Sequence, residues 1–360
     1  MNLHGIQQVL SSLDLASTTQ LSLVDGGALI GAHAPGFKPD VPALLLDLDG
    51  KDLHGLLRPL TNVYPADFEV NLLGSNDTWM PLKLAEIGGF TGNALFIPSL
   101  GTGTSLEAFQ ELIGHLRAPE DGCPWDKEQT HLSLRKHLLE ESYEALSAMD
   151  EEDTGKMREE LGDLLLQIVL NAQIGSETGA FGMADILQSI YEKIVRRHPH
   201  VFGEVQVGGV GDVLSNWEKI KAGERKKEGK SEKGILDGLP AALPALTQAQ
   251  EFQDRAARVG FDWPEVDGVL DKVAEEIEEV RNAVGDYELS DELGDLFFSL
   301  VNLARWKNID AEAALRGASL KFKRRFKFVE GRANEMKRSM QDMNLVELED
   351  LWKEAKGHLG

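Results

Sequence analysis

The chain has 360 residues, of which 42% are hydrophobic, so its length predicts two or three domains and its composition excludes disordered and fibrous proteins. It has 37 basic and 60 acidic residues, a net charge of −23, and we therefore expect neither nucleic acid nor an anionic membrane as a partner. The single cysteine, Cys123, excludes a disulfide framework and a cysteine-rich zinc module. No apolar run approaches the length of a membrane span and no signal-peptide pattern is present, which predicts a soluble, cytoplasmic protein.

Residues 1–104 are expected to form a small α/β domain. Strand-like apolar runs alternate there with turns rich in Gly, Pro and Asp. These runs lie at 21–24, 43–48, 68–73 and 94–98. From residue 105 onward the apolar spacing is helical, and a charged linker at 223–234 separates helical blocks at 105–222 and 235–360.

The two helical blocks are predicted to be copies of one unit. A Glu-x-x-Glu motif, a Glu-Leu-Gly-Asp motif, a basic cluster and a Trp followed by a Lys occur in that order in both. The pairs Glu141 and Glu276, Asp163 and Asp295, Arg197 and Arg325, and Trp217 and Trp352 are separated by 135, 132, 128 and 135 positions. Such nearly constant separations indicate an internal repeat. The predicted fold class is therefore mainly α, with two tandem all-α helical bundles after the small α/β domain.

The helix with the Glu-Leu-Gly-Asp motif has the same apolar phase in both copies. Its apolar residues follow the i, i+3, i+4, i+7 spacing of one helix face: Leu161, Leu164, Leu165 and Ile168, and then Leu293, Leu296, Phe297 and Leu300. Gly162 and Gly294 interrupt these helices, each at a cost of about 1 kcal/mol relative to Ala. Because the cost occurs twice, we expect a neighbouring helix or a ligand to approach closely at both glycines.

Each copy is predicted to gather four carboxylates. Glu-x-x-Glu and Glu-x-x-Asp each place two carboxylates on one helix face, and a loop of about ten residues, at 150–157, makes an antiparallel helix pair natural. The residues are Glu141, Glu144, Glu160 and Asp163 in the first copy, and Glu276, Glu279, Glu292 and Asp295 in the second. Four facing carboxylates require protonation or a hard divalent cation, and Mg²⁺ suits oxygen ligands. A solvated acidic face is the alternative for one copy alone, but the repeated order of motifs favours the metal site.

Basic and aromatic residues accompany the carboxylates in both copies. Lys193, Arg196 and Arg197 match Lys321, Arg324 and Arg325, and such side chains can bind phosphate oxygens that a metal does not reach. Trp217 and Trp352 offer a flat face for a nucleobase. The alternatives are a charge bias at the end of a helix for the basic clusters and simple core packing for the tryptophans.

The helical part of the chain, about 105–356, is similar to the MazG family of all-α nucleoside triphosphate pyrophosphohydrolases. The matching stretches are GCPWDKEQTH (122–131), LLEESYE (138–144), EELGDLLLQ (159–167), RRHPHVF (196–202), GFDW (260–263), EEIEEV (275–280) and DELGDLFFSLVNLAR (291–305). The resemblance implies Mg²⁺-dependent cleavage of a nucleoside triphosphate between its α and β phosphates, with Mn²⁺ as a substitute metal. It also implies a homodimer.

The resemblance also implies roles for particular residues. In the second copy, which we rank first as the catalyst, Glu276, Glu279, Glu292 and Asp295 would be catalytic metal ligands, and Lys272, Lys321, Arg325 and Trp352 would bind the nucleotide. In the first copy, Glu141, Glu144, Glu160 and Asp163 would bind metal, and Lys193, Arg197 and Trp217 would bind substrate. His137 stands where Lys272 does.

Part of residues 1–104 resembles the C-terminal half of a tetrapyrrole methylase-like domain. The resemblance rests on residues 58–74, 81–87 and 94–100, and the glycine-rich loop that such domains use for S-adenosylmethionine is absent. We therefore expect a remnant or docking domain rather than a methyltransferase. The alternative for the whole chain is a non-catalytic regulator whose helical bundles bind nucleotide or protein.

Overall fold

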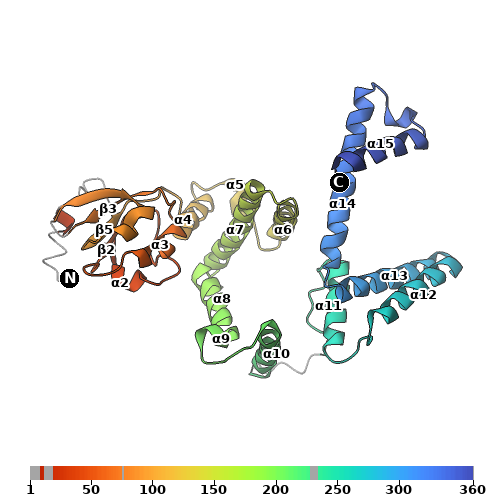
Figure 1. Ribbon diagram of the computed structural model, residues 1–360, viewed down its shortest axis with the longest axis horizontal. Helices are drawn as coiled ribbons and strands as arrows, with labels where there is room; N and C mark the ends of the chain where they lie inside the picture. Colours follow the sequence, from red (N-terminus) through yellow and green to blue (C-terminus); the bar gives the residue numbers. More distant parts are fainter. Residues whose placement is uncertain (1–8, 12–18, 75–76, 228–233, 360) are drawn as a thin grey trace. The chain divides into compact units, whose positions relative to one another are not determined.

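The computed structural model describes residues 9–11, 19–74, 77–227 and 234–359. The fold is 61% helical, with one mixed sheet of five strands near the N-terminus and helical domains after it (Figure 1), as the sequence predicts. The chain divides into two compact units, residues 1–194 and 195–360. No helix among the described residues is long and apolar enough to cross a membrane.

The N-terminal sheet has the strand order β1-β2-β5-β3-β4. The strands are β1 (Ser22–Asp25), β2 (Ala43–Leu46), β3 (Glu69–Leu73), β4 (Trp79–Lys83) and β5 (Ala94–Ile97). Strands β1 and β2 are parallel, and the other neighbouring pairs are antiparallel. The sequence predicts every strand except β4, which contains Pro81. Strand β4 lies at an edge of the described sheet, where a proline need not supply a ladder hydrogen bond.

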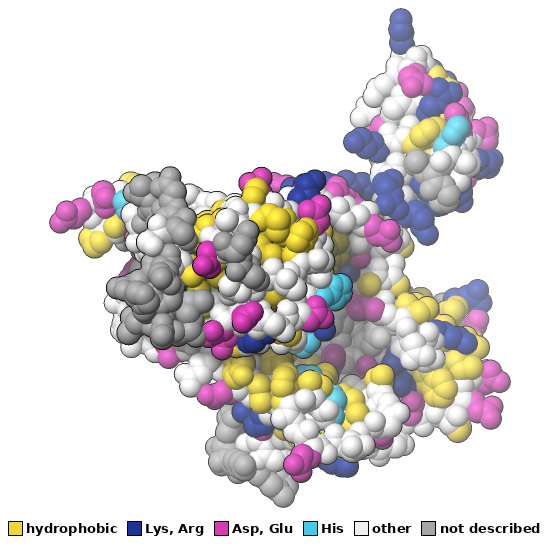
Figure 2. All heavy atoms as spheres, turned by 60° about the vertical axis from the view of Figure 1, so that its left-hand side comes forward, with side chains coloured by type: hydrophobic (Ala, Val, Ile, Leu, Met, Phe, Trp, Pro, Cys, Tyr) yellow, Lys and Arg dark blue, Asp and Glu magenta, His cyan; other side chains and the backbone are white. Residues whose placement is uncertain are grey.

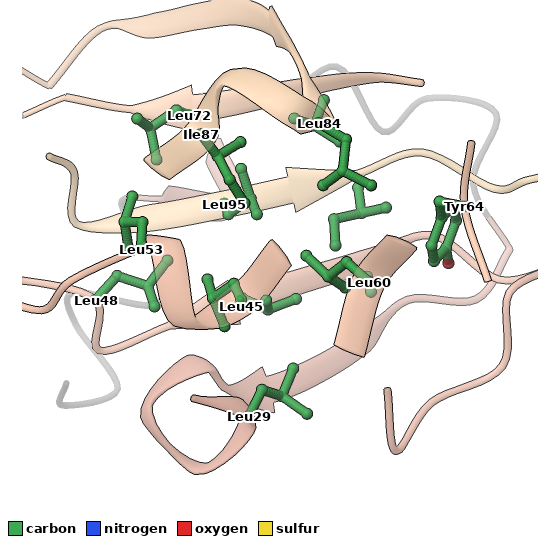
Figure 3. Close-up of a cluster of buried hydrophobic side chains, with 14 of the residues drawn as sticks. Leu29, Leu45, Leu48, Leu53, Leu60, Tyr64, Leu72, Leu84, Ile87 and Leu95 are labelled. Carbon is green, nitrogen blue, oxygen red and sulfur yellow. The ribbon is translucent and has the colours of Figure 1, made fainter. Parts of the chain in front are cut away.

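The short helices of this region cover the sheet and complete its core. They are α2 (Gly26–Leu29), α3 (His54–Thr61) and the 3₁₀ helix η1 (Leu84–Gly89). Figure 3 shows Leu45 and Leu95 of the strands close to Leu60 of α3 and Ile87 of η1, all within one buried cluster. This region therefore has a hydrophobic core of its own.

The helices of the two copies begin at matching positions. The first copy contains α4 (Leu106–Leu116), α5 (Pro124–Glu128), α6 (Leu134–Asp150), α7 (Thr154–Glu177), α8 (Met183–Arg197), α9 (Pro199–Phe202) and α10 (Val210–Lys227). The second contains α11 (Ala245–Ala257), α12 (Val266–Asn282), α13 (Asp286–Trp306), α14 (Ala311–Glu335), η2 (Met340–Asp342) and α15 (Leu345–Leu359). The first residues of α7 and α13, α8 and α14, and α10 and α15 are 132, 128 and 135 positions apart, the same separations as the sequence motifs.

Each copy is built around a helical hairpin with a very short turn. Helix α6 packs against α7, and α12 packs against α13 (Figure 1). The turns are residues 151–153 and 283–285, so the loop of about ten residues expected at 150–157 is wrong. The Asp153 carboxylate accepts hydrogen bonds from the amides of Gly155 and Lys156, and this cap starts α7 earlier than the motif suggests.

One difference between the copies has a local cause. Helix α8 ends at Arg197, whereas the matching helix α14 continues to Glu335. Pro199 follows His198 in the first copy, and proline disfavours helical backbone at the residue before it. In the second copy Lys327 stands at the matching position, and the helix runs on.

The expected close neighbour of the two motif glycines is not found within the chain. A Cβ atom added to Gly162 or Gly294 would meet no atom of the described residues within 4 Å. The apolar residues around them are also open to solvent, among them Leu161, Leu165, Phe297 and Leu300. A close approach by a neighbouring helix or a ligand at these glycines stays a prediction.

Candidate active site

The hairpin of the second copy brings three carboxylates together. Glu276 and Glu279 are three residues apart on α12 and share a face, and Glu292 lies on α13 across the short turn. One carboxylate oxygen from each lies within 4.8 Å of the others. Glu276 is buried, with 2% of its surface exposed, and Glu279 is exposed. The trio therefore lies at the surface with one buried member.

The electrostatics of this trio are those of a site in which negative charge exceeds positive charge. Desolvation and the neighbouring Glu276 carboxylate raise the pKa of Glu279. Partial burial, Glu276 and Asp295 raise the pKa of Glu292 in the same way. The amine of Lys272 lies 2.7 Å from Glu276 Oε1, and this contact raises the pKa of Lys272.

One oxygen of the trio is left without a partner. Glu276 Oε2 is buried and accepts no hydrogen bond in the described structure. A buried carboxylate oxygen normally has a hydrogen bond or a cation, because desolvation without either is costly. The unpartnered oxygen and the mutual repulsion of the trio both fit a divalent cation held by oxygen ligands.

The first copy repeats the arrangement with a different neighbour. Oxygens of Glu141, Glu144 and Glu160 also lie within 4.8 Å of one another. Partial burial first, and then the charges of nearby carboxylates, raise the pKa of Glu141 and of Glu160. His137 stands in place of Lys272, and its Nδ1 atom lies 3.4 Å from Glu140.

The fourth predicted carboxylate of each copy lies outside these groups. Asp163 and Asp295 do not belong to the sets of oxygens within 4.8 Å, although their charges help raise the pKa values of Glu141 and Glu292. They follow Glu160 and Glu292 by three residues and so lie one turn further along α7 and α13. Their role as ligands stays a prediction.

The predicted nucleotide-binding residues are spread over other helices. Lys321 and Arg325 lie on α14, and Trp352 lies on α15, which packs against α14 away from the α12–α13 hairpin (Figure 1). The Trp352 ring is 5.2 Å from that of Phe322 and packs on a buried cluster. The chain therefore does not by itself bring Trp352 to the trio of the second copy.

The matching residues of the first copy fall in both units. Lys193 belongs to the unit 1–194 together with Glu141, Glu144 and Glu160, whereas Arg197 and Trp217 belong to the unit 195–360. The Trp217 ring is half-buried and meets His198 edge to face, with ring centroids 5.2 Å apart. Core packing and nucleobase binding thus remain the two interpretations of this tryptophan.

Sequence reasoning missed the partner of the first basic cluster. Glu224 forms ion pairs with both Arg196 and Arg197, and their guanidinium groups, Arg197 first, lower the pKa of Glu224 to about 2. Residues 223–227, which the sequence predicts as part of the linker, form the end of α10. The spacing of seven residues from Trp217 to Glu224, two turns of one helix face, is the signal that could have placed it.

Comparison with known proteins identifies the family of this chain. A family model described as the MazG nucleotide pyrophosphohydrolase domain matches residues 129–202 and 265–329. The nucleoside triphosphate pyrophosphohydrolase/pyrophosphatase MazG of Thermotoga maritima is 44% identical over 252 residues, which cover 69% of this chain and 96% of the relative. The chain belongs to the MazG family.

Other relatives cover a similar part of the chain. The nucleoside triphosphate pyrophosphohydrolase of Escherichia coli K12 is 46% identical over 250 residues, 68% of this chain and 94% of the relative. The uncharacterized protein YabN of Bacillus subtilis is 48% identical over 252 residues, 69% of this chain and 51% of the relative. The MazG model does not extend into residues 1–104, and the resemblance of that segment to a tetrapyrrole methylase stays a prediction.

Proposed function

We propose that this MazG protein is a Mg²⁺-dependent nucleoside triphosphate pyrophosphohydrolase, which converts a nucleoside triphosphate and water to a nucleoside monophosphate and diphosphate. The observation that carries the proposal is the carboxylate trio on α12 and α13, with a buried Glu276 oxygen that lacks a hydrogen-bond partner. The relatives from Thermotoga maritima and Escherichia coli bear the name of this activity. Removal of incorrect nucleotides from the cellular pool is the role we assign to it.

In the second copy, some residues would bind the metal and others would bind the substrate. Glu276, Glu279 and Glu292 would hold Mg²⁺, or Mn²⁺ in its place, with Asp295 as a further ligand. The metal supplies charge neutralisation of the triphosphate and polarisation of the phosphorus atom. A carboxylate not fully engaged with the metal accepts a proton from the water that attacks the phosphorus in line.

The basic residues act on the leaving group. Lys321 and Arg325 donate hydrogen bonds to the leaving diphosphate and stabilise its growing charge. Lys272, held 2.7 Å from Glu276, is placed beside the metal position and reaches a phosphate oxygen from there. Trp352 contacts the base.

We also propose that the active molecule is a homodimer. Large apolar side chains are exposed on both hairpins, among them Leu139 on α6, Ile168 on α7, Leu270 on α12 and Phe297 on α13. Figure 2 shows hydrophobic side chains gathered in patches on the surface. A second copy that covers the hairpins would bury this surface and bring a Trp352 towards a trio that its own chain does not reach. We place the enzyme in the cytoplasm, where nucleoside triphosphates are made and used, and assign it no nucleic-acid or membrane partner.

The first copy favours a second function, nucleotide binding without turnover. Its carboxylate trio is complete, but His137 replaces Lys272, and Arg196 and Arg197 are paired with Glu224. Both features of the first copy would lower its affinity for a phosphate. The first copy would then act as a regulatory nucleotide site.

Matched substitutions in the two copies test which of them catalyses hydrolysis. We expect Glu276→Gln to lower kcat for nucleoside triphosphate hydrolysis at least about a hundredfold, because it removes the buried metal ligand. The matched variant Glu141→Gln should retain kcat within about threefold. Hydrolysis rates in Mg²⁺ and in EDTA provide the measurement, and full activity of Glu276→Gln would assign catalysis elsewhere.

A further inference from the structure

A carboxylate forms ion pairs with the two arginines of the basic cluster of the first MazG copy. Arg196 and Arg197 lie at the end of α8, Glu224 lies in the last turn of α10, and all three belong to the unit 195–360. Arg197 Nη2 is 2.7 Å from Glu224 Oε2, and Arg197 Nε is 3.4 Å from Oε1. Arg196 Nε donates to the same Oε1 at 2.6 Å. The Glu224 side chain is 16% exposed and that of Arg197 is 29% exposed, whereas that of Arg196 is 52% exposed.

The contact has the geometry by which arginine binds phosphate. A guanidinium group recognises phosphate and carboxylate alike through two parallel donors, and Arg197 offers two donors to the two oxygens of Glu224. A triphosphate that reached Arg197 would have to displace this carboxylate. Glu224 and a phosphate group are therefore alternative occupants of one position.

The second copy lacks this carboxylate. Trp217 and Trp352 are 135 positions apart, and at this separation the position matching Glu224 is Leu359, which carries no charge. The basic cluster itself is present in both copies, as Arg197 and Arg325. The two copies therefore differ in the residue at the position of Glu224.

We propose that Glu224 is an internal competitor for phosphate, which occupies the phosphate position of Arg197 and lowers the affinity of the first MazG copy for a nucleoside triphosphate. This inference rests on the proposed function, in which Arg197 binds phosphate. On this proposal the first copy fills only at high nucleotide concentration.

A purely structural role makes a different prediction. If the pair only ties α8 to α10, removal of Glu224 lowers the melting temperature and leaves nucleotide affinity unchanged or weaker. If Glu224 competes with phosphate, removal raises the affinity. Binding and stability are therefore measured together on every variant.

The test uses the full chain with Glu276→Gln and Glu292→Gln, which disable the metal site of the second copy. Binding of α,β-methylene-ATP, which cannot be cleaved between the α and β phosphates, is measured by calorimetry with Mg²⁺. In this background, Glu224→Gln should lower the dissociation constant about tenfold. Glu192→Gln removes the same charge from an exposed position of α8 and should change nothing. Arg197→Ala added to Glu224→Gln should cancel the gain.

Glu224→Asp is the second variant, since it keeps the charge on a shorter side chain and preserves folding if Glu224→Gln does not. Its dissociation constant should lie between those of the parent and Glu224→Gln. Parent-like or weaker binding in both variants would overturn the proposal and leave the pair as a link between helices. Such a failure would not affect the proposed function, which fails only if the parent chain shows no Mg²⁺-dependent hydrolysis of nucleoside triphosphates.

Discussion

Glu276 is the buried member of the carboxylate trio at which we propose that the second copy is catalytic. In the part of the chain that the structure describes, it forms an ion pair with Lys272 on the same helix. A single lysine leaves one Glu276 oxygen without a partner and leaves the pKa values of Glu279 and Glu292 raised. The folded chain thus maintains an unfavourable cluster of negative charge, which a bound divalent cation would relieve.

This repulsion should appear in the pH dependence of stability. The raised pKa of Glu292 means that the folded state binds a proton more tightly than the unfolded state, whose pKa is near 4.5. Stability is therefore lost as the pH rises from 4.5 through the folded-state pKa. In EDTA, Glu292→Gln should raise the melting temperature relative to the parent at about pH 7 and have little effect at about pH 4.

Added Mg²⁺ should reverse the order of the melting temperatures of the parent chain and Glu292→Gln. It should raise the melting temperature of the parent chain, because it binds only the folded state, and should do so much less for Glu292→Gln. Thermal unfolding, monitored by circular dichroism in EDTA and in Mg²⁺, gives the melting temperature of both proteins in both conditions. A parent chain that is more stable than Glu292→Gln in EDTA at neutral pH would contradict the repulsion inferred from the structure.

The sequence predicts well which carboxylates lie together, but it does not predict which residues contact the carboxylates and the basic cluster. The Glu-x-x-Glu spacing and its repetition are local properties, so the trios could be predicted. The geometry that leaves Asp163 and Asp295 outside them depends on how two helices rotate against each other, which no motif specifies. Glu224 was missed because a run of charged residues resembles a linker, although its helix phase continues from Trp217.

At the scale of elements, the repeat predicts where the helices begin better than which of their residues are buried. The matched helices begin at the separations of 132, 128 and 135 positions that the motifs show, because caps and motifs are encoded locally. The apolar face predicted on α7 and α13 is mostly exposed, and the buried residues of these helices are others, such as Leu170 and Val301. Periodicity identifies a face to be buried and does not say which molecule buries it.

A single substitution tests whether a second copy covers this face. Phe297 on α13 is 57% exposed, so Phe297→Lys should leave the fold of one chain intact. If the exposed apolar face is the homodimer interface, the lysine buries an unpaired charge there and shifts the chain to monomers. Light scattering coupled to gel filtration reports the mass. A dimer that persists in Phe297→Lys would place the interface elsewhere.

At the scale of the whole molecule, the sheet region is joined to the first helical copy by specific contacts. The Ser105 hydroxyl caps α4 by accepting from the Ala108 amide and donates to Asp40 Oδ2 at 2.6 Å. Lys38 lies 3.7 Å from Glu107 on the same helix. These contacts lie within the unit 1–194 and fix the start of α4, which packs on α7, the helix of Glu160. A docking or remnant role for residues 1–104 stays a prediction.

The net charge of −23 means that the whole enzyme requires cations to bind a triphosphate. A triphosphate approaching so acidic a surface is repelled unless cations reverse the local sign, and both carboxylate trios increase that repulsion. Metal-free protein should therefore be inactive rather than slow. Hydrolysis between the α and β phosphates is the central claim, and it rests on the carboxylate trio and on the relatives that bear the name of this activity.

Product analysis tests this claim most directly. The purified chain is incubated with each nucleoside triphosphate, with Mg²⁺ or with EDTA, and the nucleoside mono- and diphosphates, phosphate and diphosphate are separated and quantified. We expect the monophosphate and diphosphate in equal amounts, only when Mg²⁺ is present. Nucleoside diphosphate with phosphate, or equal turnover in EDTA, would contradict the account.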